Sequence, residues 1–271
     1  MIKVAEAFSR KAQVYDAFGE DHPNLSRMRQ KVRQHVLACL RTGDRILELN
    51  AGTGADAAFF ANLGFTVHAT DVSSGMVAAI EQKRASQGLE SRLTVQQCSF
   101  DSLEQLDGRS FDFVFSNMGG INCTADLDRI AGGVDKLLKP DGRVTWVIMP
   151  PICLWELAQT LRGDLSTALR RLSPGGTMAH VEGMHFVTWY HPPRRVVRAF
   201  GNHYRLLRLE GLSVFTPPAD HKFFPTRHQR LYGWLQRLDD LLADHYPFNH
   251  WGDFYILTLE KHQPSTSTGE G

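Results

Sequence analysis

The sequence predicts an α/β protein with a mostly parallel, seven-stranded sheet, helices on both faces, and a cap inserted after the fifth strand. Three observations lead to this fold class. From about residue 45 onward, short apolar segments alternate with segments whose apolar residues recur at helical spacing, an order that favours parallel strands joined by helices. A glycine-rich turn separates the first such strand from the first helix. Beyond Pro150 the alternation stops and later resumes, which indicates an insertion.

Five strands and three helices are expected in the first part of this series. The strands are expected at residues 45–49, 65–71, 92–97, 111–116 and 143–149. The helices are expected at residues 55–63, 74–87 and 127–138. Residues 139–142, Lys-Pro-Asp-Gly, have the composition of a turn. The segment 111–116 is apolar enough to be a central strand.

The cap and the rest of the sheet are expected in the second part. The cap consists of a helix at 155–172, a break at Ser173-Pro-Gly-Gly, and an aromatic, strand-like stretch at 181–190. Pro192-Pro193 can open a helix that runs to about residue 204, because proline is tolerated in the first helical turn. The last elements are expected at 205–215 (strand), 227–244 (helix) and 253–260 (strand).

These elements divide the chain into five consecutive regions. They are an N-terminal helical segment (1–36), a core (37–150), the cap (151–192), the completion of the core sheet (193–262), and a polar tail (263–271) that we expect to be disordered.

Composition and charge are those of an ordinary globular protein. Thirty Lys and Arg residues against 29 Asp and Glu residues leave a net charge of +1, which provides no field to hold nucleic acid or a membrane surface. No apolar run approaches the roughly 18 residues of a membrane helix, and the N-terminus lacks the apolar core of a signal peptide. Four separate cysteines without a C-x-x-C pair suit free thiols in a reducing compartment: Cys39, Cys98, Cys123 and Cys153. We therefore expect a cytoplasmic protein.

The glycine-rich turn indicates a nucleotide-binding site. Gly52-Thr-Gly54-Ala-Asp-Ala57 fits the loose pattern G-x-G-x-x-G/A between a strand and a helix. Gly52 and Gly54 allow a ligand to approach the backbone, and the free N–H groups of the following helix can bind polar ligand atoms. Asp71 ends the next strand, where its carboxylate can accept both hydroxyls of a ribose. An adenosine-containing cofactor is therefore expected.

Glu48 decides which adenosine cofactor the turn would bind. It lies within the last residues of a strand, where a dinucleotide dehydrogenase would normally have an apolar residue. A buried carboxylate needs a partner. The ammonium group of S-adenosylmethionine would supply one, whereas NAD carries no such group.

Several motifs together resemble the class I, Rossmann-like S-adenosylmethionine-dependent methyltransferases of the small-molecule type. Leu47-Glu-Leu-Asn-Ala-Gly-Thr-Gly54 resembles their first motif, and Asp71-Val-Ser-Ser-Gly-Met76 resembles the D-x-S-x-x-M run after their second strand. Residues 111–117 and 138–143 are similar to their fourth strand and to the turn before their fifth. The resemblance covers roughly residues 37–149.

The resemblance implies a role for each matching residue. Glu48 would hold the methionine end, Asp71 the ribose hydroxyls, and Met76 one face of the adenine. Phe100 would lie beside the adenine ring, and Ser116 and Asn117 would border the methionine moiety. The complete cofactor set that we expect is Glu48, Asn50, Gly52, Gly54, Asp71, Ser73, Met76, Ser99, Phe100, Ser116 and Asn117.

Two positions depart from the family pattern. Asn50 stands where many relatives have the first glycine, and asparagine tolerates a left-handed backbone better than most residues, so the turn is expected to survive. The usual acid after the third strand falls on Ser99, with Asp101 two residues later. Either Ser99 accepts the adenine amino group directly, or a local shift allows Asp101 to accept it.

The implied reaction is an in-line displacement that transfers the sulfonium methyl group to an oxygen, nitrogen or carbon atom of a small molecule and leaves S-adenosylhomocysteine. Positioning can supply much of the rate, so no dedicated base is named. Residues 8–16 resemble the segment that folds over the cofactor in such enzymes, which would place Tyr15 near the sulfonium. His191, beside Tyr190, is a second candidate for the acceptor pocket.

Other polar clusters have plainer explanations. Asp126 and Asp128 are expected to favour the start of a helix rather than to bind a metal, and no metal is expected. The histidines form no ligand spacing: His180, His185, His191 and His203. A set of arginines indicates a solvated basic face, or else contact with a carboxylate or phosphate of the substrate: Arg194, Arg195, Arg198, Arg205 and Arg208.

Aromatic residues of the cap favour core packing, with an apolar or aromatic acceptor where they face the cofactor: Trp155, Phe186, Trp189, Tyr190, Phe223, Phe224 and Trp251. The alternatives are a methyltransferase acting on RNA, DNA or protein, an NAD-dependent oxidoreductase, and a cofactor-binding protein without catalysis. Residues 116–120 lack the N-P-P-Y type of motif that serves base amino groups, and Cys123 does not follow a proline as a cytosine C5 nucleophile would.

Overall fold

The computed structural model describes residues 22–181 and 183–262. Most of the expected N-terminal segment, with Tyr15, and all of the polar tail lie outside the described residues. Among the described residues, no helix combines the length and apolar character that crossing a lipid bilayer demands.

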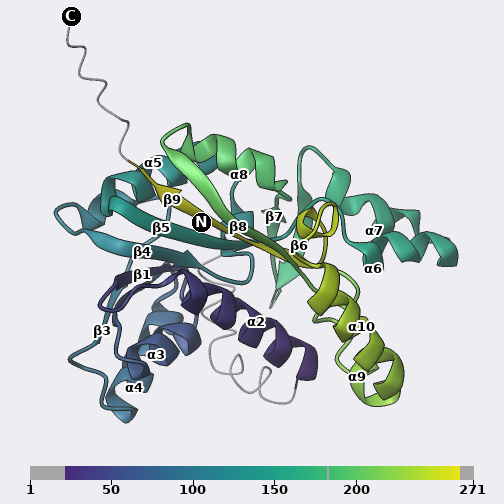
Figure 1. Ribbon diagram of the computed structural model, residues 1–271, viewed down its shortest axis with the longest axis horizontal. Coiled ribbons are helices and arrows are strands. Elements are labelled where there is room, and N and C mark those ends of the chain that lie inside the picture. Colours follow the sequence, from purple (N-terminus) through teal and green to yellow (C-terminus); the bar gives the residue numbers. More distant parts are fainter. Residues whose placement is uncertain (1–21, 182, 263–271) are drawn as a thin grey trace, which may run out of the picture.

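The fold class is confirmed: one sheet of seven strands carries helices on both faces (Figure 1). The strand order is β3-β2-β1-β4-β5-β9-β8. Neighbouring strands are parallel from β3 through β5, whereas β9 runs antiparallel to both β5 and β8. The strands are β1 (Arg45–Leu49), β2 (Thr66–Asp71), β3 (Leu93–Gln97), β4 (Phe111–Ser116), β5 (Leu138–Ile148), β8 (Tyr204–Leu212) and β9 (Phe254–Lys261).

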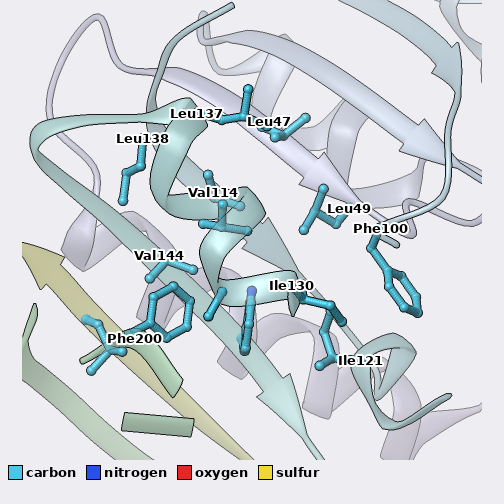
Figure 2. Packing of buried hydrophobic residues seen from close by; sticks show 14 of the residues in the cluster. Leu47, Leu49, Phe100, Val114, Ile121, Ile130, Leu137, Leu138, Val144 and Phe200 are labelled. Atoms are coloured by element: carbon cyan, nitrogen blue, oxygen red, sulfur yellow. The ribbon is translucent and has the colours of Figure 1, made fainter. Parts of the chain in front are cut away.

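Helices cover the two faces with separate apolar clusters. One cluster includes Ile130 of α5 and Phe200 of α8, which pack on β4 and β5 (Figure 2). The other includes Val32 of α2 and Phe60 of α3, on the opposite face of the sheet (Figure 1). These helices are α2 (Pro23–Cys39), α3 (Ala55–Asn62), α4 (Ser74–Ser86), α5 (Leu127–Leu137) and α8 (Pro193–Phe200), and a further helix, α10 (Gln229–Leu242), lies between β8 and β9 in the chain. Burial on both faces explains why the central strands are almost wholly apolar.

The chain order places the switch point of the sheet between β1 and β4. The chain proceeds outward from β1 to β3, crosses back to β4, and proceeds outward again on the other side. In open α/β sheets a ligand binds beyond the carboxyl ends of the strands that flank such a point. Glu48 and Asn117, at or just beyond these ends, are therefore brought to the same edge.

The cap is a set of short elements rather than one long helix and one strand. The helix expected at 155–172 is wrong as a single element, because Gly163 adopts a left-handed φ of 79° and separates two short helices. The strand expected at 181–190 is present as the shorter β7, and it pairs antiparallel with a strand that was not expected, β6. The cap elements are α6 (Leu154–Leu157), α7 (Leu165–Leu169), β6 (Thr177–Val181) and β7 (Met184–Thr188), and α9 (Phe224–Arg227) precedes α10.

Two further boundaries differ from the expectation. Residues 139–142 were expected as a turn before the fifth strand, but they lie within β5 as a bulge. Phe111 of β4 pairs with Leu138, and Phe113, two residues later, pairs with Arg143, five residues further along β5. The helix expected to run to about residue 204 ends at Phe200, because Gly201 takes a positive φ of 77°.

The interpretation of Asp126 as a helix start is confirmed, since its side chain accepts the backbone N–H of Arg129 at 3.1 Å. The basic set beyond Pro193 is partly neutralised by acids. Arg195 pairs with Asp128, and Arg205 pairs with Glu260. These pairs leave less of that face available for an anionic substrate than its arginine count indicates.

Candidate active site

A cavity of about 290 Å³ lies at the carboxyl edge of the parallel strands, where the loops after β1, β2 and β4 meet the hairpin β6–β7. Seven of the eleven expected cofactor residues line it: Glu48, Asn50, Gly52, Asp71, Met76, Phe100 and Asn117. These residues come from four strands and the segments that follow them. The convergence arises because parallel strands end at one edge of the sheet.

Glu48 is a buried acid whose carboxylate faces this cavity. The residue is 2% exposed, and its Oε2 has no hydrogen-bond partner among the described residues. Burial, with a smaller contribution from the like charge of Asp56, raises the pKa of Glu48 well above its usual range. A buried carboxyl group costs free energy unless a hydrogen-bond donor or a cation pairs with it.

Arg29 brings the opposite charge to the same cavity, and the sequence analysis missed it. The residue lies on α2 and lines the cavity, and its buried Nε has no hydrogen-bond partner among the described residues. The helical recurrence of the apolar residues Met28, Val32 and Val36 could have identified α2, and the facing position of Arg29 would then have followed.

Asp56, also missed, connects three elements at the cavity wall. Its Oδ1 accepts Arg33 Nε of α2 at 2.7 Å, and its Oδ2 accepts Asn117 Nδ2 at 2.7 Å. The carboxylate is thereby paired within the protein, in contrast to that of Glu48. Asp56 thus fixes α2 and the segment after β4 against the first turn of α3.

Asp71 is held by two backbone donors and still has acceptor capacity. Its Oδ2 accepts the N–H of Gly52 at 2.9 Å, and its Oδ1 accepts the N–H of Ser73 at 2.9 Å. Burial raises the pKa of Asp71, and these two hydrogen bonds oppose that shift. Because a carboxylate offers about four lone-pair sites, two sites remain for donors that enter the cavity.

Asn50 holds the turn after β1 in the left-handed conformation, with φ 46°, as the sequence predicts. Its Oδ1 accepts Ser116 Oγ at 2.7 Å, and its Nδ2 donates to the carbonyl oxygen of Asn117 at 3.2 Å. Ser116 is therefore a buried support for Asn50 rather than part of the cavity wall. The departure from glycine at position 50 thus gives the turn a side-chain connection to β4.

Gly54 and Ser73 also act from behind the wall. A Cβ built on Gly54, whose φ is 74°, would lie 2.9 Å from Ile80 Cγ1, so the glycine permits close packing of α3 on α4. The hydroxyl of Ser73 accepts the N–H of Met76 at 3.1 Å and caps α4. Both residues position the wall without lining it.

The segment after β3 presents Cys98 and Phe100 to the cavity. Neither Ser99 nor Asp101 lines the cavity; the Ser99 hydroxyl instead accepts the N–H of Asp101 at 3.2 Å. The alternation of side chains along an extended segment explains why residues 98 and 100 point the same way. The structure brings neither candidate for the adenine amino group into the wall.

His191 does not reach the cavity either. The residue is buried, and its Nε2 donates to the carbonyl oxygen of Thr124 at 2.9 Å. Burial lowers the pKa of the ring, and the hydrogen bond to Thr124 opposes that shift. The structure therefore places His191 as a packing residue between the cap and the loop before α5.

Of the cap aromatics, Phe186 is the one that lines the cavity. Trp155 instead donates its Nε1 proton to the carbonyl oxygen of Phe215 and packs edge-on against Phe224 at 5.1 Å. Further residues that line the cavity near the cap were not identified as site residues from the sequence: Met118, Gly119, Gly120, Cys123, Met149, Ala179 and Thr188.

Comparisons with known proteins agree on the core of the chain. Residues 46–142 match the family described as "Methyltransferase domain". A non-reducing polyketide synthase, subA, from Metarhizium robertsii is 34% identical over 130 residues, which are 43% of this chain and 6% of the synthase. A malonyl-[acyl-carrier protein] O-methyltransferase from Methylovorus sp. is 30% identical over 172 residues, 60% of this chain and 55% of that protein.

The matched segments thus span little of the synthase and about half of the O-methyltransferase. Among solved structures, the CcbJ methyltransferase from Streptomyces caelestis has a TM-score of 0.60 at 16% identity, covering 93% of this chain and 96% of that one. At this identity the likeness establishes the fold. The coverage extends well beyond residues 46–142.

Proposed function

We propose that the protein, whose residues 46–142 match the methyltransferase domain family and whose fold is Rossmann-like, is an S-adenosylmethionine-dependent methyltransferase that acts on a small molecule. One observation carries the proposal: Glu48 and Arg29, two opposite charges that each have a buried atom without a hydrogen-bond partner among the described residues, line the same cavity as Asp71. An amino acid group needs one carboxylate and one cation, and a ribose needs a hydroxyl acceptor.

The residues fit this cofactor at each of its parts. Glu48 would accept the ammonium group and Arg29 would donate to the carboxylate. These contacts would give partners to two buried polar atoms that have none within residues 22–181 and 183–262. Asp71 would use its remaining lone pairs for the two ribose hydroxyls. Met76 and Phe100 would enclose the adenine with apolar surface.

The cofactor, when bound, supplies a methyl group already activated by positive sulfur. The protein then has to hold the acceptor atom in line at about 3 Å and to keep water out, and positioning of this kind can supply several kcal/mol. The thiol of Cys123 is not a base for the acceptor, because burial raises its pKa to about 12. The acceptor atom is an oxygen, nitrogen or carbon.

Charge and thiol chemistry support a small acceptor and a cytoplasmic protein over a nucleic acid partner. The net charge is +1. Among the described residues that line the cavity, Arg29 is the one Arg or Lys, and it is assigned to the cofactor. All four cysteines are free thiols, as in a reducing compartment. The relatives named as O-methyltransferases support transfer to oxygen within this class.

Calorimetry with S-adenosylhomocysteine tests the proposal. We expect the wild type to bind it and Asp71→Ala to weaken binding at least tenfold, because two buried hydroxyls would lose their acceptor. Asp112→Ala is the matched control: this aspartate lies on β4 away from the cavity, pairs with Lys139, and should leave affinity unchanged. No binding by the wild type, or equal affinity in Asp71→Ala, would contradict the proposal.

A further inference from the structure

The hairpin β6–β7 presents one face to the cavity and the other to solvent. In its register Ala179 lies opposite Phe186, and both side chains line the cavity. Met178, the residue before Ala179 in β6, is 65% exposed, and the rings of His180 and His185 contact each other on the outer face with centroids 4.6 Å apart and planes 34° apart. This alternation makes the hairpin a wall with a defined inner surface.

A buried amide fixes the position of that wall. Asn122, with 0% exposure, accepts the N–H of Met149 at 2.9 Å and donates from Nδ2 to the carbonyl oxygens of Trp189, at 2.6 Å, and Met149. Its own carbonyl oxygen accepts the N–H of Trp189 at 2.8 Å. The end of β5 and the exit of the hairpin are therefore joined through one side chain. Satisfied buried networks of this kind specify a single arrangement.

The part of the cavity that this wall encloses carries no charge among its described lining residues. We call it the acceptor lobe and define it by Met118, Cys123, Met149, Ala179 and Phe186. The charged lining residues come from other segments of the chain, namely α2, the ends of β1 and β2, and the start of α3: Arg29, Glu48, Asp71 and Asp56. Burial keeps the Cys123 thiol protonated by raising its pKa to about 12. An apolar, neutral group binds such a surface most favourably, because its transfer from water leaves no charge or polar atom without a partner.

We propose that the cross-strand pair Ala179 and Phe186 selects the acceptor, which presents a flat, uncharged, apolar or aromatic portion to the acceptor lobe. The small side chain of Ala179 leaves the space, and the ring of Phe186 provides the surface on which that portion packs. The inference rests on the proposed function, because it assumes that the rest of the cavity holds the cofactor.

The test needs no knowledge of the natural acceptor. A nitrogen analogue of the cofactor that carries an N-benzyl group in place of the sulfonium methyl projects a flat apolar ring toward the lobe. Its affinity and that of S-adenosylhomocysteine are measured by calorimetry for the wild type, Ala179→Phe, and the volume-swapping double variant Ala179→Phe/Phe186→Ala. Met178→Phe, one residue away on the outer face, is the matched control.

We expect Ala179→Phe to bind the benzyl analogue at least tenfold more weakly, with S-adenosylhomocysteine affinity within twofold of the wild type. The double variant should regain most of the loss, and Met178→Phe should bind both ligands as the wild type does. If Ala179→Phe also loses S-adenosylhomocysteine, Ala179→Leu repeats the test with a smaller addition.

Three results would overturn the proposal. They are full affinity of Ala179→Phe for the benzyl analogue, an equal loss in Met178→Phe, and a wild type that binds S-adenosylhomocysteine but excludes the analogue. Failure of the wild type to bind S-adenosylhomocysteine itself would instead contradict the proposed function, so the two failures are distinguishable.

Discussion

The amide of Asn50 occupies the space that a side chain at position 120 would need. A Cβ built on Gly120 would overlap the side-chain atoms of Asn50, whose Oδ1 and Nδ2 are already engaged by Ser116 and Asn117. The turn after β1 and the segment after β4 therefore fit one another as a pair. Both segments line the cavity, so their fit bears on ligand binding as well as on stability.

Gly120→Ala should destabilise the protein by about 1–3 kcal/mol, the usual cost of overpacking a filled site. Asn50→Gly should also destabilise it, because two hydrogen bonds are lost. The double variant Asn50→Gly/Gly120→Ala should cost less than the sum of the two, by about 1 kcal/mol or more, since the overlap is gone. Urea unfolding of the four proteins measures this coupling, and strictly additive costs would show that the two positions do not meet.

Glu48→Gln should stabilise the cofactor-free protein while weakening its binding of S-adenosylhomocysteine. Burial raises the pKa of Glu48 above the ordinary value of 4.5, so the native state keeps a proton that the unfolded chain releases. Wild-type stability therefore falls as pH rises from about 4.5 through the raised pKa, and the glutamine variant lacks this loss.

Thermal unfolding at pH 5 and pH 8 measures this effect. At pH 8 the variant should unfold about 2–4 °C higher, the shift that about 1 kcal/mol produces in a domain of roughly this size. At pH 5 the gap should be smaller. A variant less stable than the wild type at pH 8 would show that Glu48 is already well paired without cofactor.

Arg171→Met should cost about 3–5 kcal/mol of unfolding free energy, because it leaves the buried carboxylate of Asp253 without its cation, whereas Glu156 keeps its pair with Arg170. The side chain is 4% exposed and donates to Glu156 and Asp253 at 2.8 Å, which ties the cap to the start of β9. Arg195→Met is the control: its partner Asp128 is 66% exposed, so the change should cost about 0–1 kcal/mol. Equal costs in urea unfolding would argue against the buried network as the anchor of the cap.

The sequence predicted most of the sheet and the half of the cavity that its motifs encode. Glu48, Gly52 and Asp71 lie at strand ends, and a parallel arrangement brings such ends to one edge without further information. Apolar patterning locates each strand to within a few residues, so it also locates the carboxyl end of that strand. The cofactor role of these residues stays a prediction until a ligand is measured.

Residues that act through distant partners were not predictable in this way. Ser116 could be assigned to the cavity by motif, yet its hydroxyl turns to Asn50, and no sequence pattern indicates that bond. His191 has a neighbour in sequence that suggests a pocket, but burial against Thr124 decides its place. The strand β6 was likewise not predicted, because its pairing with β7 is a contact between two segments. The break at Gly163 follows a local rule, since glycine readily takes the left-handed φ at which a helix ends.

By itself, the sequence determined the alternating α/β order, the parallel edge at which its motifs meet, and the adenosine chemistry that those motifs suit. Only the tertiary structure decided which charges meet there, because Arg29 and Glu48 come from separate elements. It also decided the acceptor side, where Asn122 joins the end of β5 to a hairpin exit 67 residues away along the chain. Local patterns report a residue's neighbours within a few turns or strand positions, whereas a cavity is closed by contacts between segments that only the folded chain brings together.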